Sequence, residues 1–196
     1  MMKFLLTVLF FCASFSFASI DTIDVDVGIS VFKTMPIGIV PFGEAGDFSK
    51  LEEKPDVTIA NDLNLSGRFS VVPAQKFDLL KFSRERAKFY ITGRLDNVDN
   101  GKIKVSCYLY ASQTKDLMLG EAYTVSPREA RRSIHHFVDK VIKQLWGEQG
   151  VASTRLTWVT KIDGQKQIVV ADYDGHDRRQ ITRDTSVNMM PVWSLH

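Results

Sequence analysis

Residues 126–150 carry the marks of one long amphipathic helix with both ends defined. Ser126, Pro127 and Glu129 form a capping box with proline in the first turn. Apolar residues recur every three or four positions and so share one face: Ile134, Phe137, Val138, Val141, Ile142 and Leu145. Gly147 can supply the left-handed residue that ends such a helix. The pattern changes on either side, so we interpret this helix as the last element of a first domain and the hinge to a second.

The first residues have the composition of a cleaved export signal. A basic residue, Lys3, precedes an apolar run over residues 4–17, and Ser16 and Ala18 provide the small residues expected before a cleavage site. At roughly 14 residues the run is short for a membrane span, which needs about 20. We therefore predict a signal peptide over residues 1–18, cleavage after Ala18, and no membrane span in the mature chain.

Composition excludes some classes of protein. The chain is 44% hydrophobic and 24% charged with a formal net charge of +2, which fits a globular protein without an electrostatic preference for nucleic acid. Cys12 lies in the predicted signal, so Cys107 is left as the only cysteine and no internal disulfide is expected. Cys107 alternates with Val105 and Leu109 on one side of a predicted strand, which indicates a buried hydrophobe and not a nucleophile.

Before the long helix, the hydrophobic pattern predicts an α/β fold, namely a mixed sheet with packed helices. Strands are predicted at residues 23–29, 36–42, 69–72, 89–98, 102–110 and 117–125. A helix of about three turns is predicted to begin at Pro55. Residues 43–54 are predicted to be a polar loop, and residues 73–88 a solvated helix or loop. Asn100-Gly101 is the strongest two-residue hairpin signal.

After residue 150, short strands are separated by Asp-Gly turns, at residues 155–160, 167–173 and 179–182. Such a pattern is typical of a β-propeller blade, although it amounts to less than one complete module here. We therefore predict an α/β domain over residues 19–148, followed by a linker and an incomplete first propeller blade over residues 149–196.

Two sets of polar residues have side chains of the kinds that bind metal ions. His135 and Asp139 share a helix face, but no third ligand lies at a recognised spacing. We interpret them as a polar pair on the helix surface, near the hinge, that docks the helix onto the linker or the following module. Residues 172–177 resemble a calcium loop, but the glycine is one position early and the closing glutamate is missing, which favours a hairpin turn. No catalytic motif is present, so we predict no enzyme activity and no catalytic, cofactor or metal site.

Several motifs together resemble the TolB family of the Tol-Pal cell-envelope system. In chain order they are residues 36–42, 60–63, 66–69, the His135 and Asp139 pair, and residues 154–159, 172–175 and 191–194. Their order and spacing are specific, although none is decisive alone. The resemblance implies a periplasmic protein whose first domain is like the anticodon-binding domains of some tRNA synthetases, followed by a β-propeller.

The resemblance also implies partners. The family binds TolA through the mature N-terminal segment, which corresponds here to Ile23, Asp24, Val25, Asp26, Val27 and Ile29. It binds the lipoprotein Pal through the propeller, which in this chain is truncated at His196, so Pal is a doubtful partner. We expect a non-enzymatic adaptor that supports outer-membrane integrity and invagination during cell division. The alternative is a small-ligand or nucleic-acid binding module that uses the anticodon-binding-like domain, against which export and near-neutral charge weigh.

Overall fold

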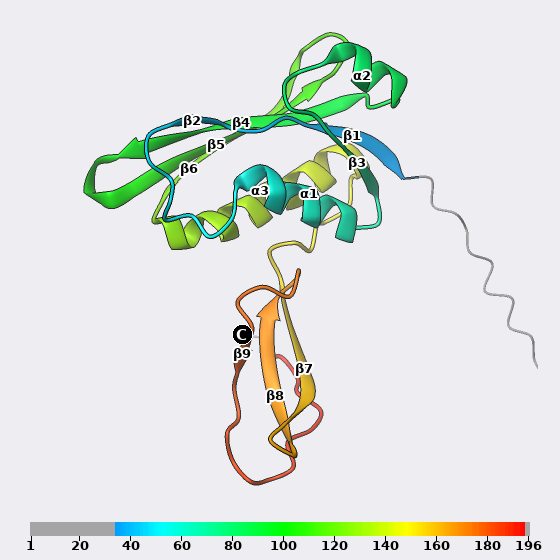
Figure 1. Cartoon of the computed structure of the whole chain (residues 1–196). Helices are drawn as coiled ribbons and strands as arrows, with labels where there is room; N and C mark the ends of the chain where they lie inside the picture. Colours follow the sequence, from blue (N-terminus) through cyan, green and yellow to red (C-terminus); the bar gives the residue numbers. More distant parts are fainter. Residues whose placement is uncertain (1–33, 195–196) are drawn as a thin grey trace, which may run out of the picture. The chain divides into compact units, whose positions relative to one another are not determined.

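The computed structural model describes residues 34–194, which form two separate β-sheets with three α-helices (Figure 1). The predicted signal peptide at residues 1–18 and the predicted strand at residues 23–29, with its proposed partner-binding residues, lie outside the described residues. In the described part, no helix has the length and apolar character that a membrane crossing requires.

The larger sheet is mixed, as its sequence pattern predicts. Its strands are β1 (Met35–Ile39), β2 (Gly43–Ala45), β3 (Phe69–Pro73), β4 (Phe89–Val98), β5 (Lys102–Ala111) and β6 (Leu117–Val125). β1 lies between β3 and β4 and is parallel to both, and β4, β5 and β6 continue as an antiparallel meander. The continuously apolar run at residues 36–42 predicts a buried inner strand, and β1 confirms this, because it lies inside the sheet.

The prediction of a polar loop over residues 43–54 is wrong at its beginning. β2 occupies the first three of these residues and pairs in parallel with β4, further along the same edge of β4 that β1 uses. The reason is that β4 is twice as long as β1, with 10 residues against 5, so its edge has backbone groups left to pair.

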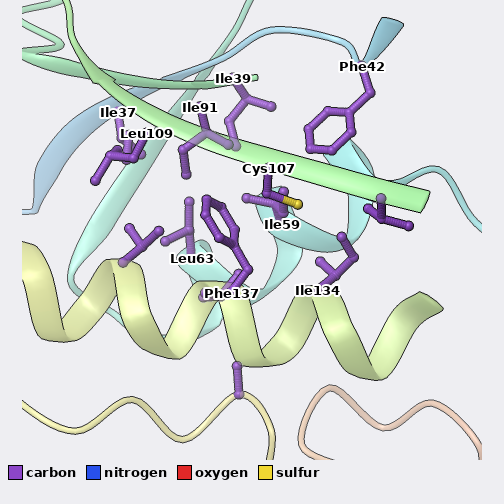
Figure 2. Packing of buried hydrophobic residues seen from close by; sticks show 14 of the residues in the cluster. Ile37, Ile39, Phe42, Ile59, Leu63, Ile91, Cys107, Leu109, Ile134 and Phe137 are labelled. Atoms are coloured by element: carbon purple, nitrogen blue, oxygen red, sulfur yellow. The ribbon is translucent and has the colours of Figure 1, made fainter. Parts of the chain in front are cut away.

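The helices lie on both faces of this sheet (Figure 1). α1 (Pro55–Leu65) and α3 (Ala130–Trp146) pack side by side on one face, and the short α2 (Leu79–Arg84) lies on the other. The main hydrophobic core fills the space between the sheet and helices α1 and α3. Figure 2 shows Ile37, Ile59, Leu63, Ile91, Cys107, Leu109 and Phe137 among its members. A smaller aromatic cluster around Phe82 and Tyr90 packs beneath α2.

Both ends of the long helix are formed as the sequence predicts. The amide of Ser126 donates to Glu129 Oε2 at 3.1 Å, which completes the capping box. The first turn, Pro127–Glu129, is a 3₁₀ helix that leads into α3. Gly147 adopts a φ of 73° and its amide donates to the Lys143 carbonyl at 2.9 Å, so the helix ends there in the left-handed conformation.

The structure also confirms the predicted hairpin turn and the predicted burial of Cys107. Asn100 and Gly101 have φ values of 64° and 69° in the turn between β4 and β5, which few other residue types tolerate. Cys107 of β5 is fully buried, and this burial raises the pKa of its thiol. A thiol held protonated in the core is unsuited to nucleophilic chemistry.

The second sheet has three antiparallel strands in the order β7 (Arg155–Ile162), β8 (Gln165–Asp172) and β9 (Arg179–Gln180). Turns with residues at positive φ, Asp163-Gly164 and Gly175, connect them. The sheet is not closed, and its strands are consistent with part of a propeller blade.

Candidate functional site

Asp139 of α3 binds the segment that leads into β7. Its Oδ1 accepts a hydrogen bond from the Ala152 amide at 2.7 Å, and its Oδ2 accepts bonds from the Ser153 amide at 3.1 Å and from the Ser153 hydroxyl. Gly150 lies so close that a Cβ atom there would come within 2.4 Å of the Asp139 Cα atom. The carboxylate and the glycine together fix this segment against the helix.

His135 lies one turn earlier on the same helix and contacts α1. Its Nδ1 is 2.6 Å from Oδ2 of Asp62, and both side chains are almost completely buried, with 3% and 0% of their surface exposed. Burial raises the pKa of the Asp62 carboxyl, and the hydrogen bond with His135 works in the opposite direction. The two helices pack directly against each other here, so this contact crosses their interface.

The interpretation of His135 and Asp139 as a surface pair therefore needs correction. The residues are only 2% and 6% exposed, because α1 packs over the first and residues 152 and 153 cover the second. They do not bind each other in the contacts of the described residues; each binds a different part of the chain.

Arg131, one turn before His135, joins α3 to two further segments. Its Nη1 donates to Oε2 of Glu53 at 2.5 Å and to the Thr58 hydroxyl at 3.2 Å, and its Nη2 donates to Asp174. Burial disfavours the charged form of Glu53, but the hydrogen bonds from Arg131 and Thr58 are together stronger and lower the pKa of its carboxyl. The guanidinium thus joins the loop before α1 to the turn after β8.

The turn at residues 172–177 contains the aspartates that resemble those of a calcium loop. It is a turn between β8 and β9, as predicted, closed by a hydrogen bond of 2.9 Å from the Asp172 amide to the His176 carbonyl. Asp174 Oδ1 accepts a bond from the His176 amide at 3.0 Å. Burial opposes ionisation of Asp174, but this bond and the charge of Arg131 lower the pKa of its carboxyl. The ionised Asp174 therefore faces α3.

Asp62, His135 and Asp174 place possible metal ligands within 4.8 Å of one another. However, Asp62 already binds Nδ1 of the imidazole at 2.6 Å, while Asp174 faces the other nitrogen, Nε2, at 4.0 Å. Asp174 also already contacts the cationic Arg131. Protein zinc sites use three or four converging ligands, so this geometry suits ion pairs and protons better than a metal.

Sequence reasoning found His135 and Asp139 but missed the partners of His135 and the role of Arg131. One signal was available: Asp62 stands between Ile59 and Leu63 on the buried face of α1. A charged residue in an apolar stripe needs a partner, because an unpaired buried charge is costly. No local pattern indicates that Asp174 contacts α3, because it lies on the turn between β8 and β9, far along the chain.

We expect Asp139→Ala to destabilise the protein by about 3 kcal/mol. The change leaves the buried amide of Ala152 and the amide of Ser153 without their acceptor, and each unsatisfied group costs about 1–3 kcal/mol. Urea unfolding followed by circular dichroism measures the loss. Gln144→Ala, on an exposed position of the same helix, is the matched control and should change stability by less than about 0.5 kcal/mol. Equal effects of the two changes would contradict the role of Asp139.

The chain is similar in sequence to proteins of one known family. Residues 23–118 match the family model described as the TolB amino-terminal domain. The Tol-Pal system protein TolB of Methylobacillus flagellatus is 28% identical over 170 residues, which cover 82% of this chain and 39% of that protein. The protein of the same name from Desulfosudis oleivorans is 32% identical over 108 residues, which cover 55% of this chain and 24% of that protein.

The fold agrees with a solved structure. The crystal structure of TolB from Acinetobacter baumannii matches with a TM-score of 0.60 and 24% identity, over 76% of this chain and 38% of that one. At this identity the likeness concerns the fold. The structural match and the alignment with the Methylobacillus protein each span about two fifths of the length of the protein compared.

Proposed function

Because the chain belongs to the TolB family through its TolB amino-terminal domain, we propose that it acts in a Tol-Pal system as a protein-binding adaptor and not as an enzyme. The observation that carries this proposal is the family match over residues 23–118. The buried polar residues support it, because Asp139 and Arg131 use their hydrogen bonds to hold segments of the chain together.

We place the contact with TolA in residues 23–29. Ile23, Val25, Val27 and Ile29 alternate with acidic residues and glycine, the pattern of a strand with one apolar side. An extended segment of this kind can add to the edge of a partner's sheet, where backbone hydrogen bonds supply affinity and alternate side chains enter pockets. In this proposal the chain is exported, cut after Ala18, and works in the periplasm with its new N-terminus available to TolA.

A second candidate function, small-ligand binding, rests on a groove of about 930 Å³. It lies where β1 and β3 end and where α1 and α2 begin, and Ile39, Val57 and Val71 contribute to its apolar lining. The two strands lead to helices on opposite faces of the sheet (Figure 1), an arrangement that often places ligand sites in α/β proteins.

Affinity capture with the mature chain, residues 19–196, distinguishes the two proposals. Envelope extract from the source organism is passed over the immobilised chain, and bound proteins and small molecules are identified by mass spectrometry. The adaptor proposal predicts recovery of TolA at 0.15 M salt. Recovery of a stoichiometric small molecule without TolA would reject the adaptor proposal in favour of the second candidate.

A further inference from the structure

The imidazole of His135 lies between carboxylates from two different parts of the fold. Asp62 of α1 is 2.6 Å from Nδ1, and Asp174, on the turn between β8 and β9, is 4.0 Å from Nε2. All three side chains are at least nine-tenths buried. Nε2 of His135 and Oδ1 of Asp62 have no hydrogen-bond partner among the described residues. Buried polar atoms rarely remain unpaired, so the empty position at Nε2 requires an explanation.

The protonation state of the ring decides what Nε2 can do. A neutral imidazole donates from only one nitrogen, whereas the imidazolium donates from both. With a single proton on Nδ1, the ring satisfies Asp62 and turns an acceptor nitrogen towards the carboxylate of Asp174. A second proton replaces this acceptor–acceptor contact with a charge-assisted donor–acceptor pair.

The charges nearest to His135 favour the second proton. Two carboxylates lie at the ring, Asp62 on α1 and Asp174 on the turn after β8. A third, Glu53 on the loop before α1, shares Arg131 with Asp174. Among the described residues, the permanent cation that pairs with these carboxylates is Arg131 on α3, which binds Glu53 and Asp174. With all three carboxylates ionised, this cluster carries two excess negative charges while the ring is neutral and one when the ring is protonated.

The more distant charges in the pocket of about 370 Å³ that His135 lines mostly pair with each other. His176 faces Glu52 with 3.6 Å between Nε2 and Oε2, while Arg155 and Arg179 face Asp172 and Asp177 at 3.6 Å and 3.2 Å. At the start of the long helix, Glu129 binds Ser126, and Arg128 and Arg132 are exposed.

We propose that His135 is a proton-dependent connection between α3 and the turn that joins β8 to β9. The protonated ring donates to Asp62 and forms an ion pair with Asp174 across 4.0 Å, and so holds the turn against the helix. Loss of one proton removes this ion pair and leaves Arg131 as the contact of α3 with Asp174. The contact contributes stability at the acidic end of the range in which histidines titrate, and that contribution is lost as the pH rises through it.

A double-mutant cycle at two pH values tests this connection in the mature chain. Asp174→Asn is expected to lower the folding equilibrium constant about tenfold more at pH 5.5 than at pH 8. This difference corresponds to about one hydrogen bond to a charged group. In a chain that already carries His135→Asn, Asp174→Asn should lower the folding equilibrium constant by the same factor at pH 5.5 and at pH 8. Asparagine retains a donor near the Nδ1 position for Asp62 but does not titrate. Both pH values leave Glu53 and Asp174 ionised, because their carboxyl pKa values are lowered.

The matched control is His176→Gln, which removes the other histidine at this pocket and should leave the tenfold pH difference intact. Loss of the difference in this control, or its persistence with His135→Asn, would overturn the proposal. If the His135 variant does not fold, NMR of the unaltered chain decides. The Hε1 signal of His135 and the carboxyl carbon of Asp174 must then shift with one common midpoint between pH 5 and 8. A failure of either signal to shift, or a stoichiometric response of both to zinc, would reject a proton-dependent contact.

Discussion

Deletion of residues 19–29 is expected to abolish binding to TolA without unfolding the protein. The deletion removes Ile23, Val25, Val27 and Ile29, which in the proposed function provide the side chains that enter the partner's pockets. The helices and both hydrophobic clusters belong to residues 34–194, so the far-ultraviolet circular dichroism of the helices should be unchanged. Isothermal titration of the soluble part of TolA into the parent and the deleted chain measures the loss.

A pair of substitutions at one position sharpens this experiment. Val25→Asp should weaken binding strongly, because it would desolvate a charge at the contact. Val25→Ile keeps an apolar β-branched side chain and should bind within a few-fold of the parent. If the deleted chain binds TolA as tightly as the parent does, the contact lies elsewhere on the domain, and the assignment of residues 23–29 is wrong.

Phe137→Ala is expected to cause the largest loss of stability from a single substitution, about 3–5 kcal/mol. The ring is fully buried on α3 and points into the main core between the helices and the sheet (Figure 2). Its removal leaves a cavity that the sheet and α1 cannot close without moving. Urea unfolding of the mature chain gives the difference in the free energy of unfolding.

His136→Ala is the control for this change, since it introduces the same residue at the adjacent, exposed position of the same helix. It should change the free energy of unfolding by less than about 0.5 kcal/mol. A loss below about 1 kcal/mol for Phe137→Ala would mean that the helix does not pack on the sheet in the way described.

The sequence alone was sufficient to predict features that depend on residues close together in the chain. Ser126 and Glu129 cap the long helix through a contact three residues apart, and Gly147 ends it through its own φ. Asn100 and Gly101 likewise form the turn between two strands that are adjacent in the sequence. Caps, turns and amphipathic stripes are local, so the pattern of residue types specifies them.

The sequence alone was insufficient to predict contacts between segments that are far apart in the chain. Parallel pairing of β1 with β3 and β4 depends on crossovers that no local pattern records. The contact between His135 and Asp62 joins residues 73 positions apart, and burial of His135 follows only from the packing of α1 on α3. A histidine and an aspartate on one helix face therefore suggested a surface pair, although each residue has its own distant partner.

The interior position of β1 has a consequence for the order in which the chain can fold. Synthesis delivers β1 before either neighbour, and β4 begins only at Phe89, whereas β4, β5 and β6 follow one another and can pair as soon as they emerge. During this interval an apolar segment with Ile37 and Ile39 is without its partners and is open to association with other chains. Pro36 and Pro41, within and just after the strand, lack amide donors and so weaken such pairing. The first described strand to be synthesised thus stays incompletely paired until β4 emerges, and its prolines weaken its association with other chains during that time.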